Sequence, residues 1–61
     1  MEIQQDVELK KICIIDDDEY IRDIYSKKLM DEGYVVLEAA NGEDGLKIVR
    51  EKKPDLILLD L

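Results

Sequence analysis

Three short apolar runs alternate along the chain with two longer stretches of helical periodicity. The apolar runs are rich in Ile, Val and Leu and predict strands at residues 12–15, 35–39 and 56–59. The first and third are apolar throughout, which is typical of strands covered on both faces, whereas the second contains Glu38 and predicts an edge strand. Helices are predicted at residues 19–32 and 42–52. The order is therefore strand, helix, strand, helix, strand.

The residues that flank the predicted helices support these limits. Asp18 and Asn41 carry side-chain oxygens that accept hydrogen bonds from first-turn amides, so both are expected as N-caps. Gly33 suits the left-handed conformation that ends many helices. Gly45, inside the second helix, predicts a close approach to the sheet, and Pro54 prevents that helix from continuing.

Helical spacing also predicts which face of each helix packs on the sheet. On the first helix the inward positions are Ile21, Ile24, Tyr25 and Leu29. On the second they are Leu46 and Val49. Each set lies along one side of its helix, so both helices are expected to bury these side chains against the strands.

Alternation of strands and helices predicts an α/β fold with a parallel sheet and right-handed crossovers. The two fully apolar strands form the central pair, so the spatial order of the strands is second, first, third. One helix then covers each face of the sheet. In open sheets of this kind, ligands bind at the carboxyl ends of the strands where the strand order reverses. That point lies between the first and third strands.

Acidic residues stand at this point in the sequence. Asp16 and Asp17 directly follow the first strand, and Asp60 directly follows the third. Carboxylates that converge repel one another unless they are protonated or bound to a cation, and a few hard oxygen ligands suit Mg²⁺. A carboxylate can also act as a nucleophile and form an aspartyl-phosphate. These residues therefore predict metal-assisted phosphoryl transfer, whereas Asp18 and Asp44 are expected to be ordinary solvated charges.

Composition narrows the partners that this chain is expected to have. Its 61 residues include nine basic and 16 acidic residues, which give a net charge of −7 and argue against binding to nucleic acid or an anionic membrane. No apolar run is long enough to span a bilayer, and the first residues do not have the basic, apolar pattern expected of a leader. Residues 1–10 lack periodicity and are expected to be a flexible lead-in. The single Cys13 is expected in the core, which favours a reducing, cytoplasmic setting.

Three motifs resemble the first half of response-regulator receiver domains, the phosphorylation modules of two-component signalling, chemotaxis receivers among them. Residues 11–19, KICIIDDDE, are similar to the first strand and its acidic pair. Residues 41–46, NGEDGL, are similar to the start of the second helix, and residues 53–61, KPDLILLDL, to the third strand with its phosphoacceptor. The resemblance implies a flavodoxin-like, five-stranded parent fold, of which residues 11–61 are the N-terminal half, truncated after the third strand.

The resemblance also implies roles for the acidic residues. Asp60 would accept a phosphoryl group from a histidine kinase or a phosphotransfer protein. Asp17 would bind Mg²⁺ directly, and Asp16 would assist through coordinated water, with Asp60 completing the metal ligands. Asp18 falls on a variable position, and Arg22 is interpreted as structural. Such a domain is a phosphoacceptor rather than a turnover enzyme.

Receivers also use a loop carbonyl, a Ser or Thr and a Lys that follow the phosphoacceptor, and no residue here matches these roles. The available lysines stand at the starts of the predicted strands, at the wrong end of the sheet: Lys10, Lys11, Lys52 and Lys53. We therefore do not expect this chain alone to switch. The unpaired third strand is expected to associate with a second copy.

Two other interpretations remain open at this point. The motif of Asp16 and Asp18 after an apolar strand resembles the start of haloacid-dehalogenase-type phosphatases, with Asp16 as the nucleophile. That motif has Thr or Val at the position of Tyr20, and it gives no role to Asp60. The third interpretation is an inert structural or oligomerising fragment that keeps its acidic residues without a function.

Overall fold

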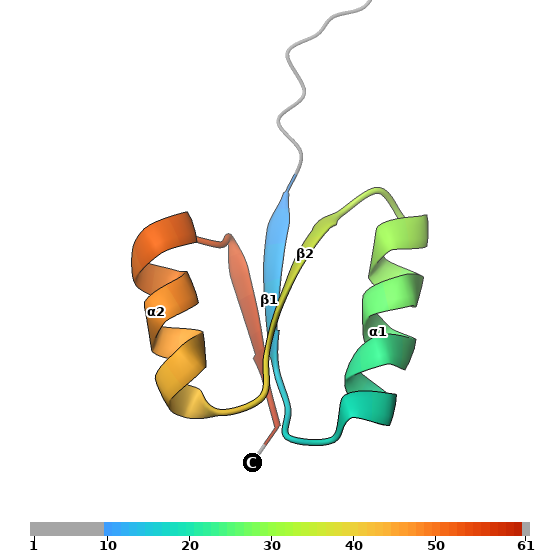
Figure 1. Ribbon diagram of the computed structural model, residues 1–61. Coiled ribbons are helices and arrows are strands. Elements are labelled where there is room, and N and C mark those ends of the chain that lie inside the picture. The colour runs from blue at the N-terminus through green and yellow to red at the C-terminus, as the bar shows by residue number, and fades with distance from the viewer. Residues whose placement is uncertain (1–9, 61) are drawn as a thin grey trace, which may run out of the picture.

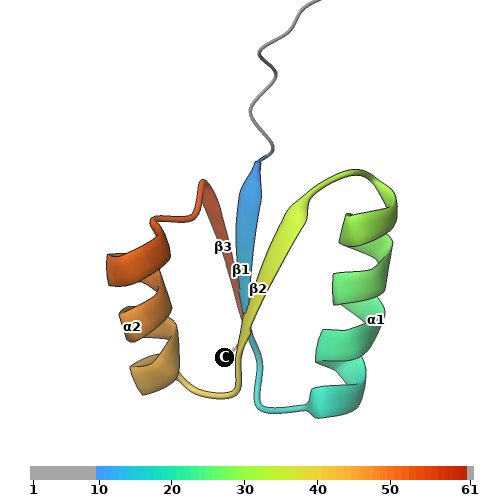
Figure 2. The same ribbon diagram turned by 45° about the horizontal axis from the view of Figure 1, so that its top comes forward.

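A computed structural model describes residues 10–60 of the chain. Figures 1 and 2 show a small sheet with one helix on each face. The elements are β1 (Lys11–Ile15), α1 (Glu19–Asp31), β2 (Val35–Ala39), α2 (Gly42–Lys52) and β3 (Leu56–Leu59). All five agree with the sequence prediction to within one residue at each end. The flexible lead-in predicted for residues 1–10 lies, apart from Lys10, outside the described residues.

The sheet is parallel and has the predicted strand order β2-β1-β3. In the register, Ile12 of β1 lies opposite Val36 and Leu56, and Ile14 lies opposite Glu38 and Leu58. Because all three strands run the same way, their carboxyl ends meet at one edge of the sheet (Figure 2). The α/β, flavodoxin-like half-fold predicted from the sequence is confirmed.

The helix ends also follow the prediction. The Asp18 side chain accepts hydrogen bonds from the amides of Tyr20 and Ile21 at 3.0 and 3.2 Å, and the Asn41 side chain accepts one from Asp44 at 2.8 Å. Both are N-caps, which satisfy amides that the first turn leaves without a helical partner. Gly33 follows α1 with φ of +98°, the left-handed region that glycine occupies without steric cost.

The core is built around β1. Its four apolar residues are between 0 and 8% exposed, and Cys13 is fully buried. On one face α2 brings Ile48 onto Cys13 and Ile15. Gly45 makes this contact possible, because a Cβ atom there would overlap Cδ1 of Ile15 and lie only 2.9 Å from its Cγ1. The predicted close approach of α2 at Gly45 is therefore confirmed.

The predicted inward faces of the helices are correct for Ile21, Leu29 and Val49, which are half-buried, and need correction at the other three positions. Leu46 of α2 is 54% exposed, and Ile48 packs on the sheet beside Gly45 instead. On α1, Ile24 and Tyr25 are 40 and 51% exposed. The reason is that, within residues 10–60, α1 lies over β1 and β2 and does not extend over β3. Its apolar face is wider than the part of the sheet that it covers.

The side of α1 that packs on the sheet is more polar than the sequence pattern predicts. Ser26 is buried, and Arg22 and Leu29, one turn before and nearly one turn after it, are half-buried. These positions form a single row along the helix, since side chains three or four residues apart lie on the same side. Polar groups therefore contribute to the interface between α1 and the sheet.

β3 is the second edge strand of this sheet, and its exposure differs from the expectation for an apolar strand. Its four side chains are between 37 and 56% exposed. Beside it, an open cavity of about 450 Å³ lies between α1 and the end of the sheet. No helix within residues 10–60 is long and apolar enough to cross a membrane.

Candidate metal and phosphoacceptor site

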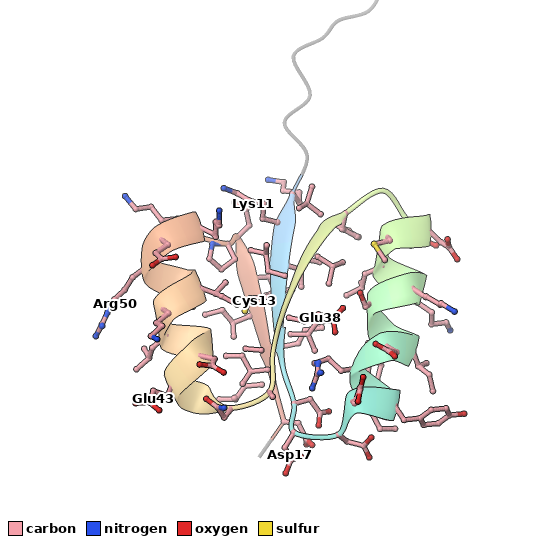
Figure 3. All side chains as sticks on the ribbon, viewed as in Figure 1. Lys11, Cys13, Asp17, Glu38, Glu43 and Arg50 are labelled. Carbon is pink, nitrogen blue, oxygen red and sulfur yellow. The ribbon has the colours of Figure 1, made fainter. Side chains whose placement is uncertain are left out.

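Three carboxylates meet at the carboxyl edge of the sheet. Asp16 and Asp17 follow β1, and Asp60 follows β3, as the sequence predicts. One carboxylate oxygen from each residue lies within 4.8 Å of the other two. Asp16 is 5% exposed, whereas Asp17 and Asp60 are exposed to solvent. Figure 3 shows Asp17 at the tip of this edge.

The sheet itself sets the positions of two of these residues. The amide of Asp16 donates to the carbonyl of Ala39 at 3.1 Å, and the amide of Asp60 donates to the carbonyl of Ile15 at 3.0 Å. Each bond continues the parallel ladder by one residue beyond a strand. Asp16 and Asp60 therefore approach one another because their strands are neighbours in register.

The turn that follows β1 holds the carboxylate of Asp16. Its Oδ1 accepts a hydrogen bond from the amide of Asp18 at 2.9 Å. The carboxylate of Asp18 points instead at the first turn of α1, where it forms the N-cap. The structure thus separates three of the neighbouring acids by role: Asp16 and Asp17 belong to the cluster, whereas Asp18 belongs to the helix.

A polar connection behind the cluster was not predicted from the sequence. Nη1 of Arg22 donates to the backbone carbonyl of Asp16 at 2.8 Å, and Nε forms an ion pair with Oε1 of Glu38 at 3.0 Å. Glu38 extends from β2 on the side of the sheet that faces α1 (Figure 3). The available signal was Glu38 itself, the charged residue within an otherwise apolar strand.

The lysines at the starts of the strands lie far from this cluster, in agreement with the prediction. Lys11 is at the opposite end of β1 from Asp17 (Figure 3). Its Nζ donates to the carbonyl of Lys52 at 2.7 Å, and its amide donates to the carboxylate of Asp55 at 2.9 Å. These contacts join the start of β1 to the end of α2 and to the loop before β3, and leave the acidic edge without a contribution from Lys11.

The donor set at the acidic edge fits Mg²⁺. Carboxylate oxygens are hard ligands, and Mg²⁺ commonly binds to one or two carboxylates while keeping several waters. The exposure of Asp17 and Asp60 leaves room for such waters. A cation would also offset the repulsion among three like charges held within 4.8 Å.

Comparison with known proteins agrees with this architecture. The model of the response regulator receiver domain family matches residues 12–61, nearly the whole chain. The chain belongs to the response regulator receiver family. Family membership leaves the dehalogenase interpretation, in which Asp16 is the nucleophile, without support.

Two individual relatives of this receiver sequence are transcriptional regulatory proteins. It is 45% identical over 53 residues to the transcriptional regulatory protein AfsQ1 of Streptomyces coelicolor, covering 87% of this chain and 24% of that protein. It is 44% identical over 52 residues to the alkaline phosphatase synthesis transcriptional regulatory protein PhoP of Bacillus subtilis, covering 85% of this chain and 22% of that protein.

A third relative of the receiver is the sporulation initiation phosphotransferase F of Bacillus subtilis. It is 44% identical over 52 residues, which cover 85% of this chain and 42% of that protein. The chain therefore spans less than half the length of each of these relatives. Its similarity to them lies in the β-α-β-α-β segment and in the acidic edge that this segment builds.

Proposed function

We propose that this receiver takes part in phosphorelay signalling and that Asp60 accepts the phosphoryl group. The observation that carries the proposal is the meeting of Asp16, Asp17 and Asp60 at one edge of the sheet in a chain of the receiver family. The donor is the phosphohistidine of a histidine kinase or of a phosphotransfer protein. The domain acts as a phosphoacceptor rather than as a turnover enzyme.

In the proposed step, a carboxylate oxygen of Asp60 attacks the phosphorus atom of the phosphohistidine. The new O–P bond forms as the N–P bond breaks, and the electrons of that bond remain on the imidazole nitrogen, which then takes up a proton. Asp60 is exposed, so a donor can reach it. Its amide, bonded to Ile15, keeps the nucleophile at the end of the ladder.

Asp16 and Asp17 have the task of holding the metal in this proposal. Asp17, which is exposed, would bind Mg²⁺ directly, with Asp60 as a further ligand. Asp16, which is buried and already bonded to Asp18, would assist in holding the ion. Bound Mg²⁺ supplies the positive charge that lets an anionic phosphoryl group approach a cluster of carboxylates. Without that charge, the two neighbouring aspartates would repel the incoming group.

Intact-mass measurement after treatment with acetyl phosphate and Mg²⁺ tests this function. We expect a low yield of singly phosphorylated chain, because residues 10–60 provide an acceptor and metal ligands at the acidic edge and the family's Ser/Thr and Lys have no counterparts among them. Asp60→Asn should abolish the adduct. In Asp17→Asn, adding Mg²⁺ should no longer increase the yield of the adduct. Asp18→Asn is the matched control, since Asn also caps helices, and should leave the adduct unchanged.

The same samples distinguish the proposal from an inert interaction fragment. Under the proposal, Mg²⁺ shifts the amide resonances of Asp17 and Asp60. A chain that shows neither an adduct nor any shift, well above physiological Mg²⁺, is inert, and the phosphoacceptor role is then wrong for it.

We also propose that the chain associates with a second copy through β3. Leu56 and Leu59 are 52 and 56% exposed on a strand whose outer edge is free within residues 10–60. Such an edge presents unpaired N–H and C=O groups beside apolar side chains. Two copies related by a two-fold axis would pair β3 antiparallel to itself.

Light scattering across a range of concentrations tests this association. We expect a dimer that dissociates on dilution and that Leu59→Lys weakens, because a charge on the exposed apolar edge of β3 opposes pairing with a second strand. A chain that remains monomeric at every concentration tested shows that the proposal is wrong.

A further inference from the structure

We propose that Arg22 is the positioning residue of the acidic cluster: its guanidinium holds the turn after β1 so that the carboxylates of Asp16 and Asp17 face Asp60. This inference rests on the proposed metal and phosphoacceptor function and deepens it. It assigns a task to a residue that the sequence suggested only as structural.

The guanidinium of Arg22 connects three elements. From α1, its Nη1 donates to the carbonyl of Asp16 at the end of β1, at 2.8 Å, and its Nε contacts the carboxylate of Glu38 on β2, at 3.0 Å. The Arg22 side chain is only 16% exposed. Bonds from a charged donor are stronger than neutral ones, and the planar fork of Arg holds two acceptors in a defined geometry.

The carbonyl that Arg22 binds belongs to the peptide group between Asp16 and Asp17. On the other side of Asp16, its amide is bonded to Ala39 in the ladder. The chain leaves the sheet at this point, so the carbonyl needs a partner from outside the strands. Arg22 provides that partner and so sets the orientation of the peptide plane from which Asp17 projects.

A second bond completes the turn. Oδ1 of Asp16 accepts from the amide of Asp18, and Asp18 in turn caps α1, the helix that carries Arg22. The arrangement is closed: the helix depends on the turn for its N-cap, and the turn depends on the helix for Arg22. Removing Arg22 would free the turn that carries Asp16 and Asp17, whereas the sheet register that places Asp60 would not change.

Charge and positioning make opposite predictions for metal binding. Arg22 is a cation close to a proposed cation site, so charge alone predicts that removing it tightens the binding of Mg²⁺. Positioning predicts weaker binding, because residues that orient metal ligands typically contribute about 10-fold to 100-fold in affinity. The direction of the change therefore decides between the two roles.

The experiment compares Arg22→Met and Arg22→Lys with Glu38→Gln in the 61-residue chain. Arg22→Met keeps the apolar stem and removes all hydrogen bonds, and Arg22→Lys keeps the charge and loses the fork. Glu38→Gln is the matched control, because it removes the ion pair and leaves the bond from Arg22 to Asp16. Far-UV circular dichroism checks that each variant folds. If Arg22→Met does not fold, the comparison is made with Arg22→Lys alone.

The first measurement is made without metal. Hydrogen exchange of the Asp18 amide, relative to the amides of β1, reports whether the turn is closed. We expect Arg22→Met and Arg22→Lys to lower the protection of Asp18 about 10-fold or more, the loss associated with a bond to a charged group, and Glu38→Gln to lower it about 3-fold at most. Unchanged protection in both Arg22 variants would overturn the inference.

The second measurement is the Mg²⁺ affinity from the amide shifts of Asp17 and Asp60. We expect about 10-fold weaker binding in both Arg22 variants. Binding that is unchanged or tighter in Arg22→Met, or equal to wild type in Arg22→Lys, would show that Arg22 acts through its charge or not at all. If the wild-type chain itself shows no response to Mg²⁺, the metal-binding part of the proposed function fails, and the Asp18 result still decides whether Arg22 holds the turn.

Discussion

β1 and β3 both contain a run of four apolar residues, and the two runs have opposite environments. Ile12, in the middle strand, is 4% exposed, whereas its register partner Leu56 is 52% exposed. Both strands contain four consecutive apolar residues, and both lie in the same sheet. The difference comes from their neighbours, because β1 has a strand on each side and a helix over each face, whereas α1 lies over β1 and β2 and leaves β3 beside an open cavity.

This contrast shows what an apolar pattern can and cannot indicate. Four consecutive apolar residues indicate a strand suited to burial on both faces. They do not identify the element that covers it. In residues 10–60 both helices lie over β1 and β2 and not over β3. β3 contributes its backbone register and Asp60, while its residues remain 37–56% exposed.

The largest expected effect comes from trimming matched side chains on the two strands. Ile12→Ala leaves a cavity in a closed core and should lower the free energy of unfolding by about 2–5 kcal/mol. Leu56→Ala, opposite it, should cost about 1 kcal/mol or less, because about half of that residue is already in water. Urea unfolding followed by circular dichroism, at a concentration where the chain is monomeric, measures both.

Equal costs for the two variants would contradict the contrast between β1 and β3. A cost for Leu56→Ala that grows with protein concentration would instead support association through β3, since a second copy would then bury Leu56.

A smaller effect is expected in thiol reactivity. Cys13 on β1 is fully buried, and its register partner Ile57 on β3 is 43% exposed. Alkylation of Cys13 should therefore require opening of the sheet and be at least about 100-fold slower than alkylation of Ile57→Cys in a Cys13→Ala background. Mass spectrometry over time measures both rates. Similar rates would show that β1 opens as readily as the edge.

The smallest effect is a pH dependence of stability. Burial raises the pKa of the Cys13 thiol, because the core disfavours the thiolate. The contribution of the neutral thiol to the free energy of unfolding is complete below the thiol pKa in the unfolded chain, about 8.5. It is lost as pH rises through the higher pKa of the folded chain, because the thiol of the unfolded chain releases its proton at a lower pH. Unfolding at pH 7 and pH 10 should show a loss that Cys13→Ala lacks. A loss of equal size in both chains would assign it to other groups.

Sequence reasoning predicted most of the fold because local signals and topology agreed. The caps Asp18 and Asn41, the glycine at position 33 and the apolar runs each mark an element boundary, and the structure places the boundaries within one residue. The cluster was predictable for the same reason. Residues that follow neighbouring parallel strands must meet at one edge, so Asp16, Asp17 and Asp60 had to approach one another.

Sequence reasoning missed the features that depend on how α1 lies over the sheet. Helical spacing identified an apolar face on α1 but not the part of the sheet that it would cover, so Ile24 and Tyr25 are more exposed than expected. The connection from Arg22 to Glu38 joins residues 16 positions apart, whose approach depends on how α1 is rotated over β2. That rotation is set by packing, including the buried Ser26, and no local pattern encodes it.

The hydrogen bond from the amide of Asp60 to the carbonyl of Ile15 is the last rung of the ladder on the exposed side of the sheet. When that rung frays, Asp60 moves away from Asp16 and Asp17, and a three-carboxylate site becomes a two-carboxylate one. Any ligand that needs all three binds only to the closed fraction of molecules, so its apparent dissociation constant is the intrinsic value divided by that fraction. A change in how often β3 frays would therefore change the affinity of the acidic edge for such a ligand, although the residues that bind it stay the same.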